Sequence, residues 1–258
     1  EITIGDWSSD VCSSDLSDSP KIVLNCVTII GRILKPSLQS AYSIGQLYQN
    51  MNNEQKNCLK QAALRALMFE ESSTRNGGAY CMSRIVTLET KPEERTNLFI
   101  YFGELVNSQE YGIYAPIGAI TAMRNILETK DFVIPLRYMK KITEIVFESC
   151  IKLMSADIPP EFKIEAPKCL KYAISIFRTN IRNYDQKLFQ LLIYNIQVDN
   201  NEFHAAVISS LTELMIVSYT YLTPEILISI FQCTFPDIQG ENKSRMINII
   251  RSEERRVG

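Results

Sequence analysis

Apolar residues recur at helical spacing along most of the chain, most clearly in residues 199–235. Asp199 and Glu202 have the spacing of a capping box at the start of a helix that we expect to end near Tyr221. One face of that helix is apolar and carries Phe203, Val207, Leu211, Leu214 and Met215. A capping hydroxyl, a proline and an early carboxylate open a second helix at residues 223–225. This stretch predicts a helix–turn–helix pair.

Similar patterns predict helices through the rest of the chain. Their expected ranges are 19–34, 40–50, 54–69, 79–88, 92–107, 116–127, 135–154, 167–182, 184–197 and 242–250. The polar, glycine-bearing residues 70–78 are expected to form a loop. In the third of these helices, Ala62, Ala63 and Ala66 would let a neighbouring helix pack closely. Because no sustained period-two alternation occurs, we predict an all-α fold.

The helices also show weak internal similarity. Four segments begin with a small residue and continue as comparable helices: AALRALMF, AITAMRNIL, CLKYAISIF and AVISSLTELM. The spacings from Ala119 to Ala166 and from Cys169 to Ala206 bracket the ~40–47-residue period of two-helix HEAT and armadillo units. The chain therefore resembles that superfamily over residues 17–250. The resemblance implies an α-solenoid of stacked antiparallel helix pairs that binds other macromolecules and supplies no chemistry of its own. The alternative is an irregular, all-helical globular domain.

The two ends of the chain differ from the rest. Residues 6–16 resemble one reading frame of a short-read sequencing adapter, and residues 251–258 resemble a translation of the partner adapter. We therefore interpret residues 1–16 and 251–258 as a non-native leader and tail. The alternative is a natural Ser/Asp-rich leader and a charged tail. On the first interpretation, residues 17–250 are an internal fragment, and helical repeats cut from their neighbours are expected to self-associate.

The charge balance depends on this interpretation. Without the two ends, Lys+Arg falls from 27 to 24, Asp+Glu falls from 29 to 23, and the net charge moves from -2 to +1. A near-neutral chain has no long-range field that attracts nucleic acid or an anionic membrane. A nucleic-acid-binding solenoid is thus the weakest alternative. No run of 18 apolar residues occurs, so we expect no membrane span.

The cysteines favour an intracellular protein, cytoplasmic or nuclear. Outside the expected leader they are scattered through apolar helical faces with no CxxC pair: Cys26, Cys58, Cys81, Cys150, Cys169 and Cys233. We interpret them as reduced core thiols, with a disulfide framework as the alternative.

Catalytic motifs are missing from the sequence. The single histidine, His204, cannot build a multi-histidine metal site, and it is expected at the surface or in packing. Gly77 and Gly78 have no lysine downstream at phosphate-loop spacing, so they are interpreted as turn glycines. We therefore predict no catalytic, cofactor-binding or metal-binding residues, no cofactor, and no enzymatic activity.

A basic stripe is the best candidate for a recognition surface. On a helix over residues 167–182, Lys168, Lys171, Arg178 and Arg182 would lie within roughly 80° of one another. Such a stripe could hold an acidic peptide or a phosphate backbone. The alternative is an ordinary solvated face. Another basic group, Arg137, Lys140 and Lys141, has Glu144 and Glu148 in helical register and is expected to pair with them.

Two functions follow. The favoured one is a non-enzymatic helical-repeat scaffold or adaptor fragment that mediates protein–protein interaction within a larger assembly. The alternative is the helical regulatory region of a large enzyme whose catalytic domain lies outside this chain.

Overall fold

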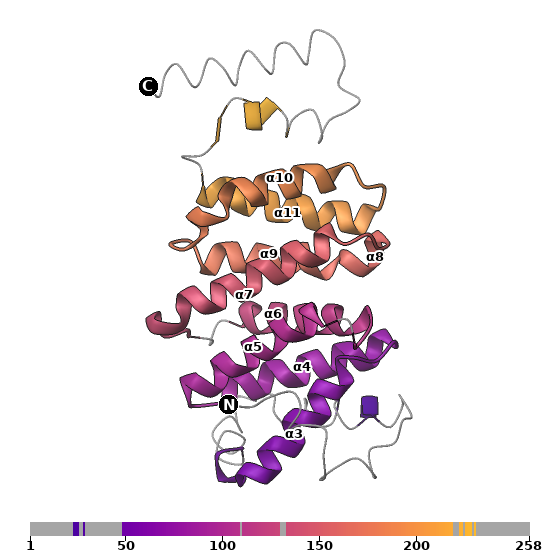
Figure 1. Ribbon diagram of the computed structural model, residues 1–258, viewed down its shortest axis with the longest axis vertical. Coiled ribbons are helices and arrows are strands. Elements are labelled where there is room, and N and C mark those ends of the chain that lie inside the picture. Colours follow the sequence, from indigo (N-terminus) through magenta and orange to yellow (C-terminus); the bar gives the residue numbers. More distant parts are fainter. Residues whose placement is uncertain are drawn as a thin grey trace, which may run out of the picture. The chain divides into compact units, whose positions relative to one another are not determined.

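The computed structural model describes residues 23–25, 28, 48–108, 110–129, 133–218, 222–223, 225–228 and 230. These residues form helices and connections with no strand among them (Figure 1), which confirms the all-α prediction. The chain divides into two compact units, Glu1–Pro135 and Leu136–Gly258, which are described separately below. Most of the expected helices at 19–34 and 40–50, the one at 242–250 and both expected non-native ends lie outside the described residues.

Four helices build the described part of unit 1. They are α3 (Asn53–Ala66), α4 (Ser72–Leu88), α5 (Pro92–Asn107) and α6 (Tyr114–Glu128). Helix α4 packs against both α3 and α6, and α5 packs against α6. The apolar faces of these helices meet in a core that includes the edge-to-face pair of Phe99 and Phe102.

The start of α3 follows from the sequence. The Asn52 side chain accepts a hydrogen bond from the Gln55 backbone, and the Gln55 side chain accepts one from the Asn52 backbone. This reciprocal capping box satisfies two backbone donors at the exposed helix end. Pro92 likewise opens α5, where its missing N–H costs nothing.

The prediction of a loop over residues 70–78 is wrong, because α4 already begins at Ser72. Gly78 lies inside the helix, where a β-carbon would stand 2.6 Å from the Ala66 Cβ and 2.9 Å from the Ala63 carbonyl oxygen. The absence of a side chain at Gly78 thus allows α3 and α4 to approach closely, and Gly78 does not form a turn. The same contact supports the prediction that the small residues of α3 admit a neighbouring helix.

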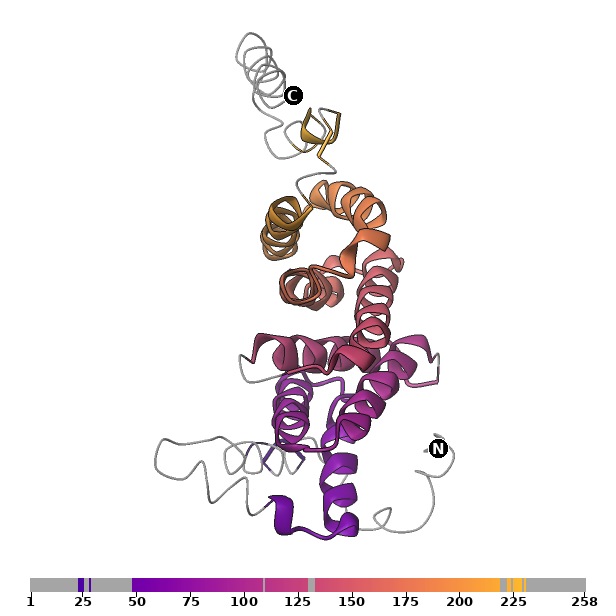
Figure 2. The same ribbon diagram turned by 90° about the vertical axis from the view of Figure 1, so that its left-hand side faces the viewer.

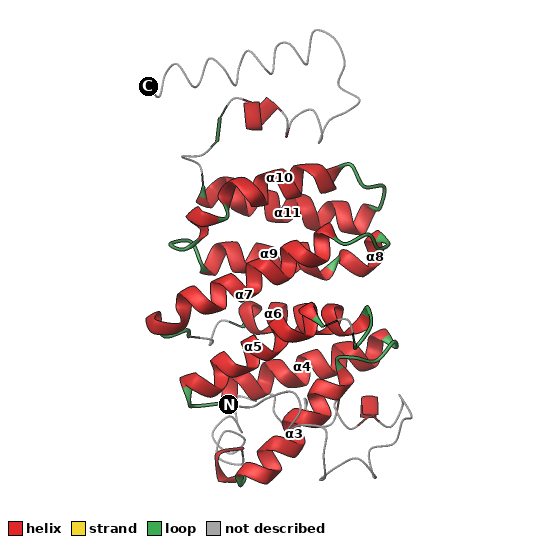
Figure 3. Cartoon of the chain, in the orientation of Figure 1, coloured by secondary structure: helices red, strands yellow, loops and turns green. Residues whose placement is uncertain are grey.

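Unit 2 contains α7 (Leu136–Ser155), the single-turn α8 (Pro160–Lys163), α9 (Glu165–Ile176), a 3₁₀ turn η2 (Ile181–Asn183), α10 (Asp185–Ile196) and α11 (Asn201–Val217). Helix α7 packs on α9 and on α10, and α11 packs on α9 and on α10. Figure 2 shows the result within this unit, with α7 and α10 on one side and α9 and α11 on the other. The connections between these helices are short (Figure 3).

Several predicted boundaries in unit 2 need correction. The expected helix over residues 167–182 ends at Ile176, because the buried Phe177 leaves helical geometry with φ -95° and ψ 29°. The cap of α11 is Asn200, whose side chain accepts from the Phe203 backbone, and not Asp199. Helix α11 ends at Val217, before Tyr221. The Thr223 hydroxyl does accept from the Ile226 backbone, which confirms the predicted cap of the next helix.

Within the described part of the chain, no helix is long and apolar enough to cross a membrane.

Candidate functional site

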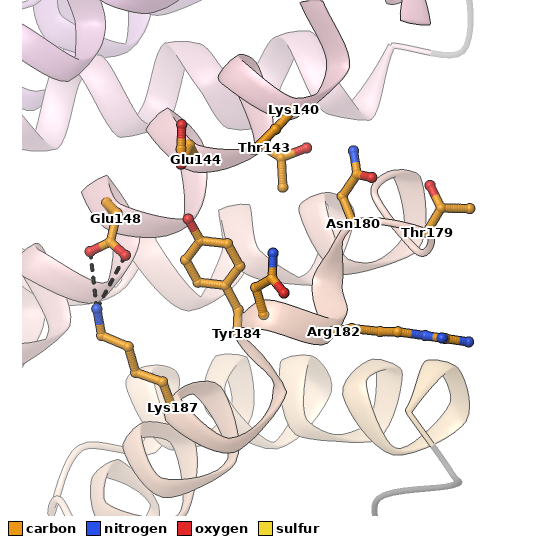
Figure 4. A pocket seen from close by; sticks show the side chains of 10 residues that line it. Lys140, Thr143, Glu144, Glu148, Thr179, Asn180, Arg182, Tyr184 and Lys187 are labelled. Carbon is orange, nitrogen blue, oxygen red and sulfur yellow. Dashed lines mark hydrogen bonds and ion pairs between the residues drawn. The ribbon is translucent and has the colours of Figure 1, made fainter.

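The strongest candidate site is a polar cavity of about 550 Å³ in unit 2 (Figure 4). Helix α7 contributes Lys140, Thr143, Glu144 and Glu148. The α9–α10 connection and the start of α10 contribute Thr179, Asn180, Arg182, Asn183, Tyr184 and Lys187. We call this site the α7–α10 cavity. Its volume falls within the ~300–1,000 Å³ of small-ligand and peptide pockets, but its lining is more polar than is usual for drug-sized ligands.

Helix α7 presents its charged residues to the cavity because the helix is amphipathic. The inward face is fully buried and carries Ile142, Val146, Phe147 and Cys150. Lys140, Glu144 and Glu148 recur every four residues and are exposed, so they form one row along the helix surface. Thr143 is buried, and its hydroxyl donates to the Met139 carbonyl at 2.7 Å.

The far side of the cavity depends on the tight connection after α9. The Asn180 backbone N–H donates to the Phe177 carbonyl, and the Tyr184 N–H donates to that of Ile181. Ile181 is buried and anchors the connection to the core. Because the two turns hold the backbone, Arg182 and Asn183 are left exposed on the cavity rim.

An aromatic ring gives the cavity its apolar contact surface. The Tyr184 ring packs against Phe147 of α7, with ring centroids 5.0 Å apart. Burial raises the pKa of Tyr184, and the negative charges of Glu148 and Glu144 raise it further. The Tyr184 hydroxyl therefore stays protonated at neutral pH and can donate a hydrogen bond.

The charges of the cavity are only partly neutralised. Lys187 pairs with Glu148 across the cavity at 3.0 Å, so Glu148 reaches α10. Lys140, Glu144 and Arg182 make no ion pair among the described residues. The cavity therefore offers two cations and one carboxylate to a ligand.

The predicted basic stripe is not a single helical face, because α9 ends before Arg178 and Arg182. Lys168 pairs with Glu202 at 2.8 Å and with Glu165 at 3.4 Å. Arg178 lies 3.6 Å from Glu213, and the Lys171 ammonium lies over the Tyr172 ring. Of the four predicted residues, Arg182 alone lines the α7–α10 cavity.

Sequence reasoning missed the other nine lining residues of this cavity. Two signals were available: the charged residues at four-residue spacing on α7, and the cluster of polar residues at 178–187. Neither signal shows that the two segments meet, because they lie about 40 residues apart in sequence.

Unit 1 holds a second cluster of charges, whose central pair, Lys60 and Glu89, is buried. The Lys60 ammonium lies 3.3 Å from Glu89 and 3.5 Å from Glu94, and the Tyr48 hydroxyl donates to Glu89. The other Glu89 oxygen accepts from the Thr90 and Lys91 backbones. Burial by itself raises the pKa of Glu89, yet Lys60 and these hydrogen bonds outweigh it and hold the pKa below its usual value. The cluster thus joins residues of α3, the end of α4 and the start of α5 in one hydrogen-bonded network.

The remaining chemistry-bearing residues form no larger cluster among the described residues, although the Cys150 and Cys169 thiols lie within hydrogen-bond contact of each other. His204 lies half-buried in the first turn of α11. Cys81, Cys150 and Cys169 are buried and unoxidised, and burial raises the pKa of the Cys81 thiol to about 12. No group of three or more His, Cys, Asp or Glu side chains within the described ranges could hold a metal ion.

Comparison with known proteins adds little. No protein-family model matches the chain, and no curated protein matches it either. One solved structure, described as an engineered protein from the Northeast Structural Genomics Consortium, aligns with 78% of this chain and 94% of its own. The identity is 13% and the TM-score 0.42, so we draw no conclusion from this likeness.

Proposed function

We propose that the chain is a non-enzymatic helical-repeat scaffold or adaptor of the HEAT/armadillo kind that holds protein partners inside the cell. The observation that carries the proposal is the pattern of helix contacts in unit 2. Adjacent helices pair as α7 with α9 and as α10 with α11, and the pairs then contact through α7 with α10 and α9 with α11. Contacts of this kind are what a repeat protein would have, in which each repeat packs on its neighbours and the stack presents a long binding surface.

The packing in unit 1 supports the same proposal. Helices α3 and α4 form one pair, α5 and α6 form another, and α4 contacts α6. The α7–α10 cavity supplies a polar, accessible surface on which a partner could lie.

Site-specific photo-crosslinking in cells tests this function. A benzoylphenylalanine at Asn183, on the cavity rim, is expected to capture a discrete protein partner. The matched control places the same probe at Thr212, which is exposed on α11 outside the cavity lining. Equal labelling from both positions, or none from Asn183, would contradict the proposal.

A further inference from the structure

We propose that the α7–α10 cavity binds an extended peptide segment of a protein partner by an acidic side chain, held between Lys140 and Arg182. This inference rests on the scaffold function and names the chemistry that its partner must carry. It also moves the recognition site away from the predicted stripe on residues 167–182 to a surface shared by α7 and the α9–α10 connection.

The two cations are available to a ligand. Both are exposed, both line the same cavity, and neither makes an ion pair among the described residues. By contrast, Lys187 is already held by Glu148, and Lys168 is held by Glu165 and Glu202. The charge of Arg182 also acts on the buried Asp185, but that carboxyl is hydrogen-bonded to Ser218. A carboxylate entering the cavity would therefore meet two positive charges that are not held in an ion pair among the described residues.

The lining favours a peptide over a nucleic acid. Glu148 is paired with Lys187, but Glu144 faces the same cavity and would repel a row of regularly spaced phosphates, whereas a single acidic side chain needs to meet only Lys140 and Arg182. Asn180 and Asn183 each offer a donor and an acceptor, which is what a peptide backbone requires. The carboxylate of Glu144 can accept from a backbone N–H or meet a basic side chain beside the acidic one.

Tyr184 supplies the apolar contact that such a peptide needs. Its ring lies between the charged groups of α7 and those of α10 (Figure 4) and is fixed by its packing on Phe147. Tyrosine is one of the residue types enriched among those that contribute most of the binding energy of an interface, and a bound peptide would cover the exposed part of this half-buried ring.

Selection from a phage library of random dodecamer peptides tests the inference on the full chain. The wild-type chain is expected to enrich peptides with Asp or Glu at a fixed position. Lys140→Glu combined with Arg182→Glu should lose those peptides and select Lys or Arg in their place. A control with the same charge change, Lys152→Glu with Lys171→Glu, alters exposed residues outside the cavity and should select the wild-type set.

The affinity of one selected peptide sharpens the test. We expect the double reversal to weaken its binding at least 10-fold, and we expect replacing its acidic residue by the matching amide to weaken binding comparably. Lys140→Gln with Arg182→Gln repeats the measurement without introducing new charge, in case the reversal disturbs folding. Circular dichroism checks the helix content of each variant.

The outcomes separate the two proposals. If peptides without acidic residues are enriched, or if acidic peptides bind both neutral and reversed variants unchanged, the inference is wrong. The same holds if no peptide is enriched, or if a random single-stranded RNA displaces the peptides. In each case, a partner still captured from Asn183 and not from Thr212 leaves the scaffold function standing.

Discussion

Two ion pairs, one in each unit, show how similar helix packing leads to different surfaces. Lys60 and Glu89 in unit 1 lie 3.3 Å apart, with side chains 7% and 8% exposed. Lys187 and Glu148 in unit 2 lie 3.0 Å apart, with side chains 52% and 53% exposed. Neither residue of the buried pair can lose its partner cheaply, because burying an unpaired charge is costly. The residues of the exposed pair can separate at little cost and form contacts with a ligand instead.

The size of the residues at the helix contacts explains part of this difference. In unit 1, Gly78 and Gly118 let helices approach until backbone and side-chain atoms touch, so little space remains between them. In unit 2, α7 and α10 meet through long charged side chains and the ring of Tyr184, and a cavity persists. Helix pairs can thus give either a closed core or an open site, depending on which residues occupy the contact.

The largest contrast is expected from removing the lysine of each pair. Lys60→Met should destabilise unit 1 by about 3–5 kcal/mol, because Glu89 is left buried without its cation. Lys187→Met should change the stability of unit 2 by less than about 1 kcal/mol, because water solvates the released Glu148. Urea unfolding followed by pulsed hydrogen exchange and mass spectrometry reports the two units separately. Similar losses from both variants would remove the distinction between the pairs.

A glycine substitution tests the close packing of unit 1. The β-carbon of Gly118→Ala would press against the Leu67 backbone, whose carbonyl carbon would lie only 2.8 Å away. We expect a loss of about 1–3 kcal/mol in unit 1, despite the better helix propensity of alanine. Gly112→Ala is the comparison, since that site has open space around it and a φ of 65°, so only backbone strain of about 1 kcal/mol is added. The same pulsed-exchange measurement gives the change in stability of unit 1 for both variants. If Gly118→Ala stabilised unit 1, α6 would not be packed against the end of α3.

The smallest expected effect is a difference in pH dependence. The lowered pKa of Glu89 adds stability to unit 1 above about pH 4, and this is lost as the pH falls through the lowered pKa. Asp185 has the opposite effect. Burial raises its pKa, and this outweighs the lowering by Ser218 and Arg182. Its contribution to the stability of unit 2 is therefore present at low pH and is lost as the pH rises through the raised pKa.

Asp185→Asn should therefore flatten the pH dependence of unit 2 and add about 1 kcal/mol or less at neutral pH. The Asn side chain can still accept the hydrogen bond from Ser218. The urea midpoint of unit 2 is measured at several pH values for both chains. The hydrogen-exchange pulse is given at one fixed pH in every case, so that only the unfolding equilibrium varies with pH. If Asp185→Asn keeps the wild-type dependence of the urea midpoint on pH, groups other than Asp185 cause that dependence.

Much of the local structure could be predicted from the sequence. The range of α5 was predicted in full, and α7 and α10 were each predicted to within one residue. These helices have a proline or a turn at one end and a continuous apolar face, so local signals agree with the final structure. The errors fell where tertiary contacts compete with local preference. Gly77 and Gly78 suggested a loop, but both lie in α4, where Gly78 packs closely against α3.

The candidate site was predicted far less well. The sequence placed Arg182 on a basic helical stripe, and that geometry fails because the buried Phe177 ends α9. Residues at helical spacing share a face only as long as the helix continues, and no local sequence signal near Phe177 indicates that the helix ends there.

For the described residues, the sequence by itself thus determined an all-helical structure and the bounds of α5, α7 and α10, because these depend on neighbours three or four residues away. Only the tertiary structure decided which charges are enclosed and which are exposed. Lys60 and Lys140 are both lysines on amphipathic helices, yet Lys60 is buried between Glu89 and Glu94, and Lys140 lines an open cavity. That difference arises from helices brought together from distant parts of the sequence, whose contacts set the local solvation of each charge.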